Sequence, residues 1–228
     1  MLRKPCCTFL IGLVLLLLST TACRTPSSET QTLVGYDAIP LYRVAVMPFL
    51  PGNTALQADD RVQPALDCTL MEFCQEASEL GFGAENALTR QMQRVMEIRL
   101  GDRVLPQTRS AAIFDTLPQN RLVDTPRQLA RRFGQAMGAD HVILGSVWRY
   151  RERTRDEAAS VAFTVYLLEV ANGRRVWRGR FEKTQQALTE DLLNAAGFFK
   201  KGARWLSAEE LARFGIEQVM QDFPKAAE

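Results

Sequence analysis

The stretch "LARRFGQAMGADHVILGSVWRYRER" (129–153) joins a helix to a long strand. Leu129, Phe133 and Met137 recur at helical spacing, and Gly138 follows the last of them, as is typical of a helix end. Upstream, Thr125-Pro126 places a capping threonine before a proline at the first helical position, with Gln128 completing a capping box. The aliphatic run after the glycine predicts a strand over Asp140–Arg153.

Further elements follow on both sides of this stretch. "LYRVAVMPF" (Leu41–Phe49) is almost entirely apolar, which indicates a strand buried on both faces. A helix is predicted over Glu85–Leu100 and a short strand over Arg103–Gln107. Downstream, strands over Ala159–Val170 and Arg174–Gln185 flank Asn172-Gly173, a strong signal for a two-residue hairpin turn.

The C-terminal part is predicted to be helical. Leu188, Leu192 and Phe199 share one helix face, and Ser207 with Glu210 forms a capping box for a last helix. The order β-α-β-α-β-β-β followed by two helices predicts an α/β fold. We expect a single sandwich domain over residues 41–228, whose mixed sheet has a parallel part and an antiparallel meander.

The N-terminus has the layout of an export signal. Arg3 and Lys4 precede an apolar run, Phe9–Leu18, that is too short to span a hydrocarbon core of about 30 Å. Thr20-Thr21-Ala22-Cys23 resembles the lipobox of bacterial lipoproteins. The resemblance implies that residues 1–22 are removed, that the Cys23 thiol takes a diacylglycerol, and that the new amine is acylated. The alternative is an ordinary cleaved signal with an incidental cysteine.

Residues 23–40 are interpreted as the lipidated cysteine and a flexible tether. Arg24 rather than aspartate follows the cysteine, which by the same resemblance implies sorting to the periplasmic face of the outer membrane. The segment from Arg24 to Pro40, which is almost entirely polar as far as Thr32, would reach about 20–25 Å as a flexible coil. The domain is therefore expected to stay close to its membrane.

Charge and residue counts exclude some function classes. Without residues 1–22, basic and acidic residues are equal in number, so nothing favours nucleic acid as a partner. His141 is the single histidine in the 228 residues, which limits metal sites and histidine-based acid–base catalysis. We therefore expect no cofactor and no enzymatic activity.

The five cysteines are Cys6, Cys7, Cys23, Cys68 and Cys74. After processing and lipidation, Cys68 and Cys74 remain, and an oxidising periplasm favours a disulfide between them. On one continuous helix their Cα atoms would be roughly 9–10 Å apart, beyond the limit of about 7 Å for a bridge. Either the chain bends between them, or both are buried thiols. Two cysteines alone do not supply a metal-ligand set.

Arginines are concentrated on two of the predicted strands. Arg149, Arg151 and Arg153 alternate along one, which places them on one face, and Arg178 and Arg180 alternate along the return strand. These five side chains are the candidate partner surface. The alternative is a solvated face neutralised by neighbouring acids. Gly145, within the first of these strands, is expected to allow close packing in the sheet.

Two segments, "RVAVMPF" and the stretch quoted first, resemble a family of periplasmic lipoproteins. It contains the curli-secretion channel lipoprotein (CsgG-like) and the activator of a penicillin-binding protein (LpoB-like). The resemblance covers roughly residues 41–185 and implies a periplasmic α/β domain. It does not carry over residue by residue to either function. The charged "RYRERTRDEA" (149–158) does not suit the lipid-facing strand of a channel, and the short tether does not suit an activator that must reach an inner-membrane enzyme.

The sequence thus predicts a non-enzymatic, lipid-anchored interaction or assembly module of the cell envelope, with an unidentified envelope protein as its partner. The alternatives are an oligomeric subunit of a secretion or envelope-assembly complex, which would make the chain a homo-oligomer, and a regulator of peptidoglycan synthesis.

Overall fold

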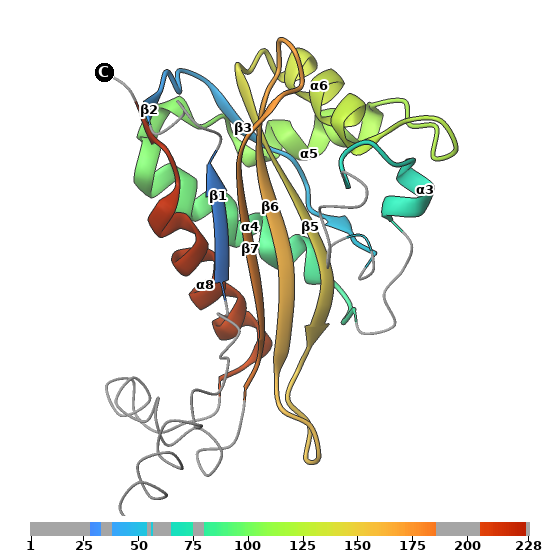
Figure 1. Ribbon diagram of the computed structural model, residues 1–228, viewed down its shortest axis with the longest axis vertical. Coiled ribbons are helices and arrows are strands. Elements are labelled where there is room, and N and C mark those ends of the chain that lie inside the picture. Colours follow the sequence, from blue (N-terminus) through green and yellow to red (C-terminus); the bar gives the residue numbers. More distant parts are fainter. Residues whose placement is uncertain are drawn as a thin grey trace, which may run out of the picture.

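A six-stranded mixed sheet forms the centre of the computed structural model, which describes residues 28–32, 38–53, 56, 65–74, 80–185 and 206–226 (Figure 1). The strands of this sheet are β1 (Ser28–Thr32), β3 (Val44–Val46), β4 (Leu50–Pro51), β5 (His141–Arg151), β6 (Ser160–Glu169) and β7 (Arg175–Thr184). A second, two-stranded sheet pairs β2 (Ala38–Ile39) with β8 (Lys225–Ala226). The helices are α3 (Leu70–Phe73), α4 (Ala84–Leu100), α5 (Gln107–Thr116), α6 (Pro126–Met137) and α8 (Ala208–Val219), with short 3₁₀ turns η1 (Gly101–Arg103) and η3 (Met220–Asp222).

Strand β5 has neighbours of both orientations. It pairs in parallel with β3 and β4, and antiparallel with β6, which in turn pairs antiparallel with β7. The predicted α/β class and mixed sheet are therefore confirmed. Gly173 has φ +73° in the turn between β6 and β7, where the sequence predicts a hairpin.

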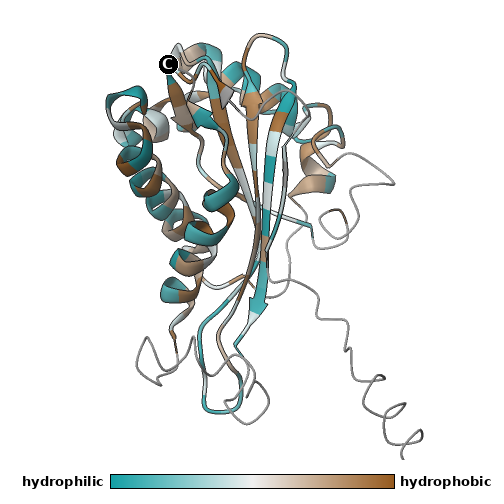
Figure 2. Ribbon diagram, turned by 60° about the vertical axis from the view of Figure 1, so that its left-hand side comes forward, coloured by the Kyte–Doolittle hydropathy of each residue, from teal (hydrophilic) through white to brown (hydrophobic). Residues whose placement is uncertain are grey.

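The sheet separates two hydrophobic cores because alternate residues of each strand face opposite sides. Ile143 and Val165 belong to the core under α4 and α8, whereas Leu144 and Tyr166 belong to the core under α3, α5 and α6. In Figure 2 the helices carry both teal and brown residues, as expected for elements with one buried and one solvated face.

Local signals determine where two of these helices begin and end. Thr125 and Gln128 form the predicted capping box of α6, and Gly138 ends that helix at φ 65°. Ser207 and Glu210 form the predicted capping box of α8. The other predicted C-terminal helix, around Leu188–Phe199, lies outside the described residues.

The region between α4 and α6 differs from the prediction. Only Val104 of the expected strand Arg103–Gln107 forms a bridge, with Val44, and a helix that was not predicted, α5, begins at Gln107. Pro106 lies at the N-cap of α5 in extended geometry, and proline cannot donate a hydrogen bond to continue a strand.

Part of the segment that the sequence predicts to be a flexible tether is a strand of the sheet. Ser28–Thr32 is strand β1, which pairs antiparallel with β7 from Ser28↔Phe181 to Thr32↔Trp177. Without β1, the backbone groups along this edge of β7 would have no strand partner. Thr30 also donates a hydrogen bond from Oγ1 to Asp222 Oδ2 at 2.9 Å. The sheet therefore begins before residue 41, and five residues after Cys23.

Gly145 confirms the predicted close packing. A Cβ added at this position would lie 2.3 Å from Cζ of Phe49, a buried ring that also packs edge-on against Phe163. The Phe49 ring thus lies directly over the backbone of β5, where any larger residue would displace it.

We predict that Gly145→Ala lowers the free energy of unfolding by about 1–3 kcal/mol, because the new methyl group overpacks the core. The same substitution should cost less in a Phe49→Leu background, where the smaller side chain can move away. Chemical denaturation of the four proteins of this cycle measures the coupling. Equal costs of Gly145→Ala in both backgrounds would show that Phe49 is not the obstacle.

Candidate partner-binding surface

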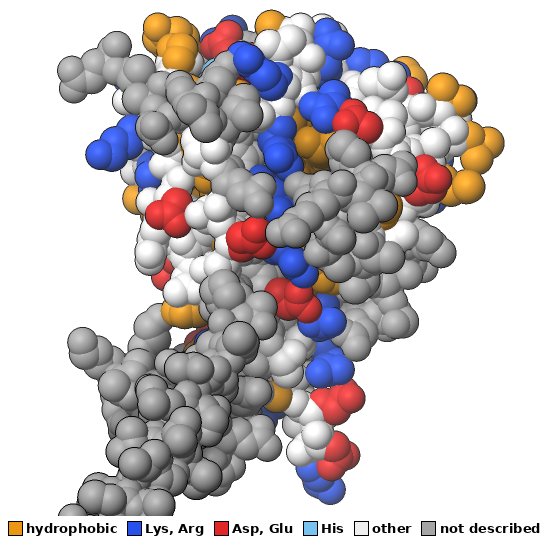
Figure 3. All heavy atoms as spheres, in the orientation of Figure 1, with side chains coloured by type: hydrophobic (Ala, Val, Ile, Leu, Met, Phe, Trp, Pro, Cys, Tyr) orange, Lys and Arg blue, Asp and Glu red, His pale blue; other side chains and the backbone are white. Residues whose placement is uncertain are grey.

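The predicted arginines lie on a polar half of the sheet. On the face covered by α6, Leu144 and Tyr166 are the last apolar pair of the core, and the next residues in register are Ser146 and Thr164. Both are fully buried, so the face becomes polar within one residue pair. Figure 3 shows a column of Lys and Arg side chains running along this side of the molecule, with Asp and Glu beside it.

Two features of the strands bring the arginines together. The register between β5 and β6 shifts between Val147 and Arg149, so Trp148 is the extra residue of a bulge. Along β7, Arg178, Arg180 and Glu182 alternate onto one face. Ala162 of β6 lies in register between Arg149 and Glu182. Its small side chain leaves room for Arg149 to reach across the strand.

Glu182 is the centre of the resulting cluster. Arg149 Nη1 donates to Glu182 Oε1 at 2.9 Å, and Arg180 Nη2 donates to Glu182 Oε2 at 2.6 Å. The Arg180 guanidinium also lies 5.6 Å from the ring centre of Trp148, within cation–π range. The arginine side chains are between a fifth and a quarter exposed.

The other three predicted residues differ from one another. Arg151 lies on β5 and pairs with Glu157, with 3.6 Å between Nε and Oε2. Arg153 lies beyond the end of β5, in the exposed turn to β6, so it does not share a strand face with Arg149 as predicted. Arg178 is only 4% exposed and cannot offer a guanidinium at the surface.

Sequence reasoning missed Glu182. The two-residue spacing between Arg180 and Glu182 on a strand is a signal that could have placed the carboxylate on the arginine face. The alternative of a face neutralised by neighbouring acids describes Arg149, Arg151 and Arg180 well. Partner binding by these residues stays a prediction.

Cys68 and Cys74 do not form the possible disulfide in this structure: both are free and buried. They flank α3, and the Cys68 thiol donates to the Ala65 carbonyl oxygen, with 3.1 Å between Sγ and O. Burial raises the pKa of both thiols to about 11, and the Glu72 carboxylate contributes to the shift at Cys68. Such thiols are almost entirely protonated at neutral pH, which slows disulfide exchange.

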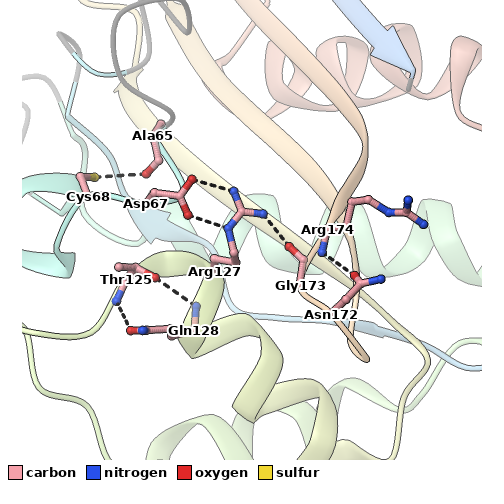
Figure 4. A network of polar contacts seen from close by, with 9 residues as sticks. All are labelled: Ala65, Asp67, Cys68, Thr125, Arg127, Gln128, Asn172, Gly173 and Arg174. Carbon is pink, nitrogen blue, oxygen red and sulfur yellow. Dashed lines mark hydrogen bonds and ion pairs between the residues drawn. The ribbon is translucent and has the colours of Figure 1, made fainter. Parts of the chain in front are cut away.

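Arg127 of α6 holds the loop beside Cys68 (Figure 4). Its guanidinium donates to both carboxylate oxygens of Asp67, at 2.6 and 2.8 Å, and to the Gly173 carbonyl oxygen at 2.6 Å. Hydrogen bonding to Arg127 lowers the pKa of Asp67. One side chain thus joins this loop, α6 and the turn between β6 and β7.

The remaining candidates add no reactive centre to the described part of the chain. His141 is buried at the start of β5, and burial lowers its pKa. Among the described residues, no three His, Cys, Asp or Glu side chains lie together as metal ligands would. Within the same ranges, no helix combines the length and the apolar character needed to cross a bilayer.

Comparison with known proteins gives structural similarity at low sequence identity. The chain matches no family model and no curated protein sequence. It is similar to the PelC dodecamer subunit from Paraburkholderia phytofirmans, with 14% identity and TM-score 0.49, covering 88% of this chain and 99% of that one. It is also similar to E. coli LpoB, with 12% identity, TM-score 0.40, and coverage of 63% and 57%.

A lipoprotein from Neisseria meningitidis is a third similar structure, with 15% identity, TM-score 0.37, and coverage of 71% and 99%. LpoB and a lipoprotein therefore occur among the similar structures. The CsgG-like part of the family resemblance seen in the sequence stays a prediction.

We predict that the processed protein, denatured without reductant, shows two reactive thiols with a thiol-specific dye. In the native protein both should react slowly, because Cys68 and Cys74 are buried and protonated. Mass spectrometry of labelled peptides identifies the sites. An absence of reactive thiols after denaturation, with two appearing after reduction, would establish the disulfide instead.

Proposed function

We propose that this protein is a lipoprotein acylated at Cys23 and held at the periplasmic face of the outer membrane. Its α/β domain would serve there as a non-enzymatic interaction or assembly module of the envelope. The observation that carries the proposal is the export signal ending in Thr20-Thr21-Ala22-Cys23. Arg24 in place of aspartate supports the outer membrane as the destination.

The position of β1 supports the proposal physically. Ser28 is the fifth residue after Cys23, so the anchor and the edge of the sheet are at most about 18 Å apart. A buried acyl chain contributes about 0.8 kcal/mol per CH₂ group, and several chains together give stable anchoring. The folded domain would therefore work within a short distance of the membrane surface.

The polar half of the sheet is the candidate surface for the partner. Arg149 and Arg180 share the Glu182 carboxylate, and Arg153 lies in the exposed turn between β5 and β6. An acidic protein surface near the membrane would complement this arrangement. Charge complementarity of this kind favours selective association rather than catalysis.

We expect Cys23→Ser to abolish stable lipid anchoring, because serine has no thiol to accept the diacylglycerol. Metabolic labelling with a radioactive fatty acid should mark the wild-type protein and leave the variant unlabelled. Cys68→Ser, which leaves the lipobox intact, serves as the control and should be labelled normally. Equal labelling of wild type and Cys23→Ser would refute acylation at this residue.

In-cell photo-crosslinking tests the interaction module. A photoreactive residue at position 153, in the turn between β5 and β6, should capture a defined envelope protein. The same residue at position 109, on α5, should not capture it. Arg151→Glu in the first protein should reduce the yield several-fold, because it reverses a charge beside the docking site. An unchanged yield would show that the arginines do not form the contact.

A further inference from the structure

A polar groove of about 170 Å³ lies between α4 and α8, away from the arginines described above. It is lined by Ala87, Arg90, Gln91, Arg94, Glu209, Glu210 and Arg213. The α4 members recur every three or four residues, so they form one stripe along the helix. The α8 members come from its first two turns. The groove is therefore formed where these two helices pack side by side.

Three guanidinium groups are available for a ligand in this groove. Arg90, Arg94 and Arg213 are exposed, and none of them forms an ion pair with another residue in the described part of the chain. Arginine donors in a fixed planar arrangement match the oxygens of a phosphate group. Glu209 and Glu210 also line the groove, so its three guanidinium groups exceed its two carboxylates by one positive charge.

The other polar residues that line the groove are Gln91, Glu209 and Glu210. Glu210 is occupied, because its carboxylate accepts the Ser207 N–H of the capping box at 3.1 Å. Gln91 donates from Nε2 to the Glu209 carbonyl oxygen at 3.0 Å, while its buried Oε1 accepts no hydrogen bond. That oxygen is buried, so the exposed arginines are the groups that a ligand in the groove would contact. The phosphate of an anionic phospholipid headgroup, such as that of phosphatidylglycerol, suits them.

Several contacts place the groove at the end of the molecule where the anchor would lie. Ser28, the first residue of β1, lies opposite Phe181, and the Phe181 ring packs 6.2 Å from that of Phe214, the neighbour of Arg213. The N–H of Ala208, at the start of α8, donates to Glu152 just beyond the end of β5. In Figure 1 this end is the lower one, where α8 begins and the turn between β5 and β6 projects.

An exposed aromatic side chain lies at the same end. Phe82 is fully exposed just before α4 begins, and the neighbouring Gly81 N–H donates to the Tyr150 carbonyl oxygen near the end of β5. Aromatic rings beside cationic side chains suit the headgroup region of a bilayer. A single end of the fold therefore combines the anchor, an exposed ring and a basic groove.

We propose that the groove between α4 and α8 binds the phosphate of an anionic phospholipid headgroup, with Arg90, Arg94 and Arg213 as ligands of the phosphate oxygens. The inference deepens the proposed function, because it rests on a domain held close to the membrane. Headgroup binding fixes how the domain is oriented on the bilayer and which of its surfaces face the periplasm.

The test titrates the full-length protein in neutral detergent micelles with dioctanoyl phosphatidylglycerol. Hydrogen–deuterium exchange at residues 87–94 and 208–213 reports occupancy. Saturable protection is expected, with dioctanoyl phosphatidylcholine and inorganic phosphate each giving far weaker protection. Each arginine near an anionic lipid contributes about a fivefold change in binding, so the triple variant R90Q/R94Q/R213Q should bind roughly a hundredfold more weakly.

The control R103Q/R109Q/R155Q removes the same charge from exposed positions outside the groove and should bind as the wild type does. No protection by phosphatidylglycerol, or equal loss in both triple variants, would overturn the proposal. Protection by inorganic phosphate at equal concentration would assign the groove to a free phosphate instead. Because the lipid is added in solution, the titration does not depend on Cys23, and labelling of Cys23 separately reports the anchor.

Discussion

Strand β5 needs hydrogen-bonding partners along both edges and packed side chains on both faces, and the rest of the fold depends on this constraint. Residues His141–Trp148 are all buried, so every backbone group there needs a protein partner and every side chain needs a packed neighbour. β3 and β4 supply one edge and β6 supplies the other. The helices then cover the two faces, because the alternating side chains of β5 divide between two cores.

Much of this arrangement follows from local sequence signals. The capping box at Thr125 and the αL glycine at Gly138 act within a few residues, and both were predicted correctly. The hairpin at Asn172-Gly173 was also predicted, but its turn is longer than the two residues expected, because β6 ends at Glu169 and β7 begins at Arg175. β1 was not predicted, because "SETQT" (28–32) lacks the apolar alternation that indicates a strand. Its pairing depends on the open edge of β7, about 150 residues away, and no local pattern reports such an edge.

The sequence predicts only part of the candidate partner surface. Alternation along β7 correctly suggests that Arg178 and Arg180 share a face, but it does not reveal that Arg178 is buried. The bulge at Trp148 depends on the register of the neighbouring strand, which sequence reasoning could not supply. Glu182 changes the interpretation most, because its carboxylate accepts hydrogen bonds from both Arg149 and Arg180.

The pairing of β1 with β7 also has a mechanical consequence. A chain attached through Cys23 transmits any pull from the membrane to the Ser28 end of β1, with few residues of slack. Hydrogen bonds between antiparallel strands lie perpendicular to the strand axis. A pull along β1 loads all five paired residues together, whereas a sideways pull opens them one after another. If Cys23 carries the lipid anchor as proposed, the resistance of β1 to separation from β7 would depend on the direction of the force.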